Sequence, residues 1–360
     1  MVAQPMKGTN VTSGLDQFVR FPLLEGPTPI QRLSRLEEVL GEATGGARLF
    51  IKRDDLTGVG GGGNKLRKLE LLIGDALARG CDTFITTGGL QSNHARQAAA
   101  ASARAGLACE LMLTDVVPRH DDAYQHNGNL LLDDLLGATV HRLPGDADAL
   151  AAAEERAREL DREGCHAYVV GSGGSSPLGC LGYARCVAEI REQERQHALT
   201  FAAIAVANGS SGTHAGLAGG MAAAGDDPRR VLSWTVLAPL VEARQTTLQL
   251  TKATLELMNP EMSLPEEAIM VDGSQRGEGY GIPTAATLDA LRRLARSEGL
   301  LLDPVYSGKA FAGFLERARS GVWRDQDVLF IMTGGTPGLF AYRDALACDD
   351  PAVASKGRSA

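Results

Sequence analysis

Short apolar runs typical of β-strands alternate, from Leu49 onward, with longer segments whose apolar residues recur at helical spacing. The expected strands are residues 49–52, 83–87, 110–113, 139–142, 167–171, 202–207, 232–237, 269–271 and 328–333. The expected helices are residues 65–79, 93–105, 129–136, 148–163, 178–197, 213–224, 242–258, 284–298 and 311–319. Apolar strands separated by helices predict an α/β fold, in which twisted, parallel-rich sheets are covered by helices on both faces.

The length and composition favour a globular enzyme over a nucleic-acid-binding or membrane protein. A chain of 360 residues is long enough for two domains or one large α/β unit. The net charge of −8 and the lack of a basic block argue against nucleic-acid binding. No run approaches the roughly 18 apolar residues that span a bilayer. Residues 1–12 are polar and lack an apolar signal region, so we expect a cytoplasmic protein, and residues 349–360 are expected to be disordered.

The cysteines and histidines show no metal-binding spacing. Six cysteines are scattered without a C-x-x-C pair, and seven histidines include no H-E-x-x-H arrangement. We therefore expect reduced, mostly buried thiols and no protein-bound catalytic metal.

A single lysine stands where a glycine run meets a helix. Residues 60–63 are four glycines, followed by Asn64, Lys65 and a segment of helical periodicity. The G-x-x-x-x-G-K-[ST] spacing of a nucleotide loop is absent, because Asn64 intervenes and Leu66 replaces the hydroxyl residue. One interpretation is a surface turn before an ordinary helix. The other is that the glycines give clearance to a flat cofactor, while a buried Lys65 serves as a nucleophilic amine.

Four loops rich in Gly, Ser and Thr follow predicted strands, at residues 86–93, 171–176, 208–213 and 333–338. Because the carboxyl ends of parallel strands meet at one edge of a sheet, these loops predict one large crevice lined with backbone donors and hydroxyls.

The loop at residues 208–213 has the features of a phosphate site. Small residues leave backbone N–H groups accessible, hydroxyls add donors, and a helix begins there. An N-capping turn is the alternative interpretation. No G-x-G-x-x-G with a following acidic residue is present, which disfavours a dinucleotide. A phosphate site together with a buried lysine instead fits pyridoxal phosphate.

Four segments then resemble one known family. They are GGNKLRKLE (62–70), QSNH (91–94), GSSGTHAGL (209–217) and LDPVYSGKA (302–310). These segments are similar to the D-cysteine desulfhydrase and 1-aminocyclopropane-1-carboxylate deaminase family, and the similarity extends over about residues 21–342. The resemblance implies a two-domain, fold-type-II pyridoxal enzyme, like the β subunit of tryptophan synthase, with the cofactor in the interdomain crevice. The large domain would comprise residues 1–66 and 176–348, and the smaller α/β domain residues 67–175.

The resemblance also implies roles for individual residues. Lys65 would form the imine with pyridoxal 5'-phosphate, and Asn64 would contact its ring hydroxyl. The phosphate would be held by Gly209, Ser210, Ser211, Gly212 and Thr213, and Ser307 would serve the ring nitrogen. The substrate would be bound by Gln91, Ser92, Asn93, His94, Tyr280 and Tyr306. The expected catalytic residues are Lys65, Ser92, Tyr280 and Tyr306.

Ser307 separates the two activities of the family. In the cyclopropane deaminase, the tyrosine that matches Tyr306 is followed by a glutamate that holds a proton on the pyridine nitrogen. A serine hydroxyl can serve a neutral ring nitrogen, which delocalises carbanion charge less far and suits prompt loss of a β leaving group. Ser307 therefore favours β-elimination over opening of the cyclopropane ring.

The predicted reaction is conversion of D-cysteine to pyruvate, hydrogen sulfide and ammonia, with Lys65 or a tyrosine of lowered pKa removing the Cα proton. Alternatives are an L-cysteate sulfo-lyase, a D-serine dehydratase-like lyase, the cyclopropane deaminase, and a non-catalytic amino-acid-binding protein. A sulfonate leaving group would require a further cationic side chain, for which Arg244 and Arg276 are candidates. The family suggests a homodimer, and a small amino acid is the only other expected partner.

Overall fold

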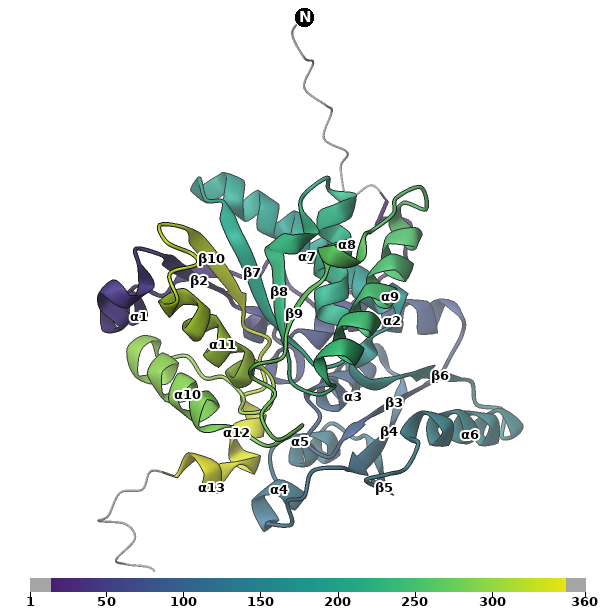
Figure 1. The fold of residues 1–360 in the computed structure, drawn as a ribbon. Helices are drawn as coiled ribbons and strands as arrows, with labels where there is room; N and C mark the ends of the chain where they lie inside the picture. The colour runs from purple at the N-terminus through teal and green to yellow at the C-terminus, as the bar shows by residue number, and fades with distance from the viewer. Residues whose placement is uncertain (1–13, 348–360) are drawn as a thin grey trace, which may run out of the picture.

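The computed structural model describes residues 14–347, which form two β-sheets and the helices around them (Figure 1). The predicted tail at residues 349–360 and the N-terminal residues 1–12 lie outside the described residues. Among residues 14–347, no helix is both long and apolar enough to cross a membrane.

The larger sheet has six strands in the order β1-β2-β10-β7-β8-β9. They span Ile30–Arg32 (β1), Arg48–Lys52 (β2), Asp327–Ile331 (β10), Phe201–Asn208 (β7), Val231–Thr235 (β8) and Met270–Asp272 (β9). All neighbouring pairs are parallel except β1 with β2. The central strand β10 therefore comes from the C-terminal part of the chain.

The smaller sheet has four parallel strands in the order β5-β4-β3-β6. They span Thr139–Pro144 (β5), Ala108–Asp115 (β4), Thr83–Gly89 (β3) and Ala167–Val170 (β6). This sheet is contiguous in sequence and interrupts the larger one between β2 and β7. The predicted domain division stays a prediction; its boundary at residue 66 falls inside the first long helix.

Thirteen α-helices lie within residues 14–347, and nine of them correspond to predicted ones. The predicted ones are α2 (Lys65–Ala78), α3 (Asn93–Ala105), α5 (Asn129–Leu135), α6 (Ala149–Arg162), α7 (Pro177–His197), α8 (Gly212–Ala223), α9 (Leu240–Met258), α10 (Ala285–Glu298) and α11 (Ser307–Arg319). Missed were α1 (Ser34–Leu40), α4 (Asp122–His126), α12 (Pro337–Ala341) and α13 (Arg343–Leu346). These four have at most seven residues, too few for a clear helical period.

Helices bury both faces of each sheet, as the apolar strands predict. On one face of the six-stranded sheet, Trp234 and Phe330 pack against Phe311 of α11. On the other face, Ile204 and Leu329 pack in a separate cluster with Tyr183 of α7 and Leu217 of α8. The four-stranded sheet likewise has α3 on one face and α6 on the other.

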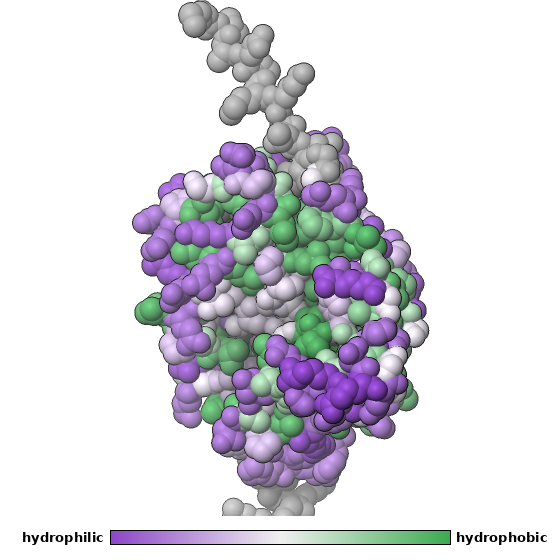
Figure 2. Space-filling view, turned by 90° about the vertical axis from the view of Figure 1, so that its right-hand side faces the viewer, coloured by the Kyte–Doolittle hydropathy of each residue, from purple (hydrophilic) through white to green (hydrophobic). Residues whose placement is uncertain are grey.

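The molecular face that lies to the right in Figure 1 is shown in Figure 2, with apolar side chains gathered over its upper part and polar ones around them. Helix α9 lies on this side, and it exposes Leu240, Val241 and Leu257 to solvent.

Candidate functional site

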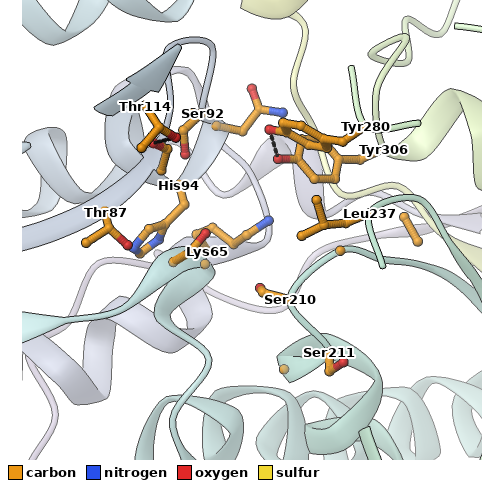
Figure 3. Close-up of a pocket in the computed structure, with 18 of the residues that line it drawn as sticks. Lys65, Thr87, Ser92, His94, Thr114, Ser210, Ser211, Leu237, Tyr280 and Tyr306 are labelled. Atoms are coloured by element: carbon orange, nitrogen blue, oxygen red, sulfur yellow. Dashed lines mark hydrogen bonds between the residues drawn. The ribbon is translucent and has the colours of Figure 1, made fainter. Parts of the chain in front are cut away.

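One cavity of about 290 Å³ lies at the carboxyl ends of strands from both sheets (Figure 3). All four predicted loops contribute to its wall. The end of β3, the turn after it and the start of α3 give Thr87, Gly88, Gly89, Ser92, Asn93 and His94; the loop after β6 gives Ser172 and Gly173; the loop after β7 and the start of α8 give residues 209–213; and the loop after β10 gives Thr333. The single crevice expected from the strand order is therefore confirmed.

Lys65 opens α2 and points into this cavity (Figure 3). Its Nζ donates to Asn64 Oδ1 at 2.8 Å and lies 5.6 Å from the centroid of the Tyr306 ring. Burial, together with the positive charge of Lys68, lowers the pKa of the Lys65 amine to about 7. A substantial fraction of the amine is therefore unprotonated near neutral pH, and only the unprotonated form can attack a carbonyl or accept a proton.

The glycines at residues 60–63 do not line the cavity, so the interpretation that they give clearance to a cofactor is wrong. All four have positive φ, from 60° to 136°. A Cβ on Gly62 would lie 2.0 Å from the carbonyl oxygen of Asp55, and one on Gly63 would lie 2.5 Å from Nε2 of Gln97. The glycines instead let the loop fold tightly against its own chain and against α3.

The N-terminus of α2 is likewise not available to an anion. Gln97 Oε1, from α3, accepts the backbone N–H groups of Lys65 at 2.9 Å and of Leu66 at 3.3 Å. The side chain of Gln97 thus caps the helix that carries Lys65, and it holds this helix against α3.

The predicted phosphate loop forms the start of α8. Ser211 has φ 65° and no side chain caps the helix. The Gly212 N–H donates to the Ser210 carbonyl oxygen at 2.8 Å, so the next N–H groups of α8, those of Thr213 and His214, are the ones that keep their donors for a ligand. Ser210 Oγ shares a 2.7 Å hydrogen bond with Ser175 Oγ, and Thr213 Oγ1 accepts from Asn64 Nδ2 at 2.9 Å. The bond from Asn64 to Thr213 ties the Lys65 loop to the phosphate loop.

Lys68 is a site residue that the sequence analysis missed. It lies one turn after Lys65, lines the same cavity, and is almost fully buried. Its Nζ donates to the Gly173 carbonyl oxygen and to Ser175 Oγ, both at 3.0 Å. It also lies close to the start of α8, since a Cβ on Gly212 would be 2.6 Å from this nitrogen. The sequence could have predicted this position, because Lys65 and Lys68 are three residues apart and therefore lie on the same face of the helix.

At the start of α3, three residues that were predicted to bind the substrate line the cavity. Ser92 Oγ accepts the N–H of Ala95 at 3.1 Å and so caps the helix. Asn93 and His94 follow on its first turn. His94 Nε2 lies 2.8 Å from Thr86 Oγ1, and burial lowers the pKa of His94 well below its usual value. His94 is therefore a neutral residue held by β3.

Tyr280 and Tyr306 close the outer side of the cavity, where their hydroxyls share a 2.5 Å hydrogen bond (Figure 3). Asp303 places Tyr306, because its carboxylate accepts the N–H groups of Val305, Tyr306 and Ser307 at the start of α11. Burial raises the pKa of both tyrosines, and that of Tyr306 lies well above its usual value. The expectation of a tyrosine base with a lowered pKa is therefore wrong, which leaves Lys65 as the candidate base.

The loop that carries Tyr280 is held by side chains from two helical segments. Lys309 Nζ, on the first turn of α11, donates to the carbonyl oxygens of Arg276 and Gly279, both at 2.7 Å. Tyr342 donates its hydroxyl to the carbonyl oxygen of Gly281 at 2.8 Å. These bonds fix the backbone on either side of Tyr280.

Two predicted site residues do not line the cavity. The Gln91 side chain donates to the carbonyl oxygens of Tyr124 and Asn127 and accepts the N–H of Asn129. Ser307 is fully buried, and its hydroxyl donates to Asp303 Oδ2. Both residues lie directly behind residues that do line the cavity, which a linear motif cannot distinguish from the wall itself.

The residues present fit pyridoxal phosphate. The uncapped α8 N-terminus, the hydroxyl of Ser210 and the Lys68 ammonium converge as donors for a phosphate. Lys65, half-buried and with a lowered pKa, lines the same cavity. No group of three or more His, Cys, Asp or Glu side chains arranged to hold a metal ion occurs within residues 14–347.

Comparison with known proteins gives close matches over nearly the whole chain. Residues 22–334 match the family described as pyridoxal-phosphate dependent enzyme. A D-cysteine desulfhydrase of Serratia proteamaculans (strain 568) is 41% identical over 337 residues, covering 92% of this chain and 98% of that protein. A D-cysteine desulfhydrase of Yersinia enterocolitica (serotype O:8 / biotype 1B) is 41% identical over 334 residues, covering 91% and 97%.

Solved structures match as well. The crystal structure of a homologue of ACC deaminase superposes with a TM-score of 0.83 and 38% identity, covering 93% of this chain and 98% of that one. An O-ureido-L-serine synthase variant shares the fold, with a TM-score of 0.61 and 16% identity, covering 96% and 98%. The α/β, fold-type-II architecture predicted from the sequence is confirmed.

Proposed function

Because the chain belongs to the family of pyridoxal-phosphate dependent enzymes, we propose that it converts D-cysteine and water to pyruvate, hydrogen sulfide and ammonia. The observation that carries this proposal is the cavity in which a half-buried Lys65 with an amine of lowered pKa lies near a helix N-terminus that no side chain caps. The two D-cysteine desulfhydrases that are 41% identical to this chain over nearly their full length support the choice of substrate.

The cofactor would be held at both ends by this chain's residues. Lys65 would bind its aldehyde carbon covalently. The N–H groups of residues 209–213 would surround the phosphate, with the Lys68 ammonium beside them. Asn64, which already bonds with Thr213, would face the ring hydroxyl. Ser307 would act toward the ring nitrogen from its position beside Asp303.

Lys65 would also move the proton that starts the reaction. Bound pyridoxal phosphate withdraws electrons from the substrate Cα and thereby acidifies its C–H bond. An amine with a pKa near 7 is matched to accept that proton at neutral pH. Tyr280 and Tyr306 keep their protons because burial raises both pKa values, so their hydroxyls can donate to the departing sulfur.

The cavity wall argues against the sulfo-lyase alternative. Neither Arg244 nor Arg276 lines the cavity: Arg244 donates to the Glu266 carbonyl oxygen and Arg276 to that of Leu237. Leu237 itself borders the cavity, and Val116 and Ala147 also line it. Such a wall suits a small thiol better than a sulfonate. A D-serine dehydratase-like reaction stays an alternative, and Ser307 still disfavours ring opening of the cyclopropane substrate.

The test combines spectra with product analysis. The purified protein is expected to show a visible imine band that Lys65→Ala abolishes. It is then mixed with D-cysteine, L-cysteine, D-serine, L-cysteate and the cyclopropane amino acid, and sulfide and keto acid are measured. Equal amounts of sulfide and pyruvate from D-cysteine are the expected result. If another amino acid turns over and D-cysteine does not, the substrate assignment fails while the cofactor assignment stands.

The protein is also proposed to be a cytoplasmic homodimer of two-domain subunits, divided at residues 66/67 and 175/176. Leu240 and Val241 of α9 and Met270 of β9 are exposed and border one groove, which supports an interface between two copies, because burying them removes apolar surface from water. Light scattering coupled to size exclusion would measure the mass; a monomer at micromolar concentration would contradict the dimer.

A further inference from the structure

Behind the cavity wall, Arg96 connects three segments: the glycine run before Lys65, the start of α3 and the start of α5. Its guanidinium is fully buried on α3. Nη2 donates to the Gly62 carbonyl oxygen at 2.7 Å, and Nη1 donates to Asn129 Oδ1 at 2.6 Å and to Asn93 Oδ1 at 3.3 Å. Arg96 has no role in any step of the proposed reaction.

An arginine fixes the orientation of any amide that faces it, because a guanidinium has five donors and no acceptor. The atom of Asn129 that faces Arg96 must therefore be its oxygen. Its amide nitrogen is then turned the other way, where Nδ2 donates to the Gln91 carbonyl oxygen and to Asn93 Oδ1, both at 3.0 Å. The backbone N–H of Asn129, which donates to Gln91 Oε1 at 2.9 Å, anchors the residue.

The orientation of Asn93 follows from the same rule. Its Oδ1 receives two donors, one from Arg96 and one from Asn129. Its Nδ2 has no acceptor among the described residues, although Asn93 lines the cavity and keeps 7% of its surface exposed. A reversed amide would place Nδ2 against two donors and leave them unpaired, which costs about 1–3 kcal/mol for each buried group.

We propose that Arg96 and Asn129 are positioning residues that hold the Asn93 amide so that its N–H groups face an anionic oxygen in the cavity. This inference rests on the proposed function, in which two such oxygens occur: the substrate carboxylate and the ring oxygen of the cofactor. Gln91, predicted to touch substrate, contributes by anchoring Asn129.

The charge of the arginine is maintained in this position. Burial lowers the pKa of Arg96 to about 10, against the opposing charges of Asp133 and Asp303, so the guanidinium remains protonated near neutral pH. The side-chain amides of Asn129 and Asn93 therefore keep the same orientation over the pH range in which an enzyme of this class would be assayed.

The test exchanges one amide for its isosteric carboxylate. Asn129→Asp keeps the oxygen that faces Arg96 but replaces the donor toward Asn93 by an acceptor. Asn93 Oδ1 then loses the closer of its two donors and its Nδ2 gains an acceptor, which favours the reversed amide with its oxygen toward the cavity. Asn127→Asp is the matched control, since Asn127 is exposed and contacts neither Arg96 nor Asn93 through its side chain. Melting temperature and far-ultraviolet circular dichroism establish that both variants fold.

The readout is binding of alanine, in both configurations, followed through the cofactor absorption band. Alanine has no leaving group, so this readout stands even if D-cysteine is not the substrate. If the substrate carboxylate is the acceptor, the Kd of alanine rises about 10- to 100-fold in Asn129→Asp. The Kd of alaninamide, which lacks the carboxylate, stays within about twofold.

If the ring oxygen is the acceptor, the absorption band of Asn129→Asp or its titration with pH shifts before any amino acid is added, and alanine and alaninamide are affected equally. The proposal is overturned if Asn129→Asp matches Asn127→Asp in both readouts. Should Asn129→Asp fail to fold, Asn129→Ala removes the donor without adding charge. A several-fold loss in either readout is then expected, and its absence would overturn the proposal.

Discussion

Among single residues, the most consequential one that the sequence analysis missed is Lys68. It is buried beside the start of α8, and two of its three donors are taken by Gly173 and Ser175. The third is left for a phosphate oxygen. We expect Lys68→Met to weaken cofactor binding about 10- to 100-fold, because a hydrogen bond to a charged group contributes roughly 1.5–3 kcal/mol. Titration of dialysed protein with pyridoxal phosphate measures this. Lys252→Met, at an exposed lysine of α9, should leave the affinity unchanged.

Tyr306 gives a second prediction at this scale. Its raised pKa keeps the hydroxyl protonated, so that it can donate a hydrogen bond to the departing sulfur, and Tyr306→Phe should lower kcat for D-cysteine about 10- to 100-fold, since a hydrogen bond to a charged group contributes roughly 1.5–3 kcal/mol. The visible band should persist, because Lys65 is untouched. Tyr168→Phe serves as the control, since Tyr168 bonds with Asp75 on α2 and does not line the cavity. A Tyr306→Phe enzyme with unchanged kcat would remove the tyrosine from the mechanism.

At the scale of elements, the glycine run before α2 is a packing device. Gly61 and Gly62 both have positive φ, yet a Cβ on Gly61 would meet open space and one on Gly62 would collide with the Asp55 backbone. Gly61→Ala should therefore cost only the left-handed backbone penalty of about 1–2 kcal/mol. Gly62→Ala should cost about 1–3 kcal/mol more, from overpacking against atoms that cannot rotate away. Urea unfolding compares them, and equal midpoints would argue against this role.

The helices and strands were predicted more completely than the residues of the site. Every predicted strand and helix is present, because apolar periodicity depends on local burial alone. Strand β1 was missed because its three residues are mostly exposed and carry no apolar pattern. Lys65, Ser92, Tyr280 and Tyr306 were placed in one cavity by motif resemblance. Gln91 lies behind the wall because its partners are more than 30 positions away, which no local pattern records. Ser307 bonds with Asp303 only four residues earlier, but the motif does not show that this bond turns its hydroxyl away from the cavity.

At the scale of the whole molecule, a buried ionic network joins the N-terminal segment, α2 and α7. Arg67 donates to Asp54 Oδ1 at 2.8 Å and to Glu189 Oε2 at 2.8 Å, and Lys52 donates to Glu189. Burial disfavours the Asp54 charge, but Arg67, Lys52 and the Tyr183 hydroxyl outweigh it and lower the pKa of Asp54 to about 2.

This network predicts how stability depends on acid. Asp54 has a folded pKa below its unfolded value of 3.8, so its contribution is present above pH 4 and is lost as the pH falls toward 2. The difference corresponds to about 2 kcal/mol. Urea unfolding at a series of pH values between 5 and 2 should show this loss, and Asp54→Asn should be less stable at pH 5 with a flatter dependence. A wild-type stability that does not change over this range would contradict the pKa assignment.

The strand order of the larger sheet has a consequence for the order in which the chain is made. Strand β2 pairs with β10, Phe50 opposite Leu329, so the centre of that sheet is joined only after nearly the whole chain has been synthesised. The four-stranded sheet is complete once residue 170 has left the ribosome. In nascent chains stalled at about residue 220, residues 83–170 should therefore resist protease, whereas residues 30–52 should be cleaved. Strand β2 still lacks its partner β10 at that stage, because β10 lies about 280 residues further along the chain.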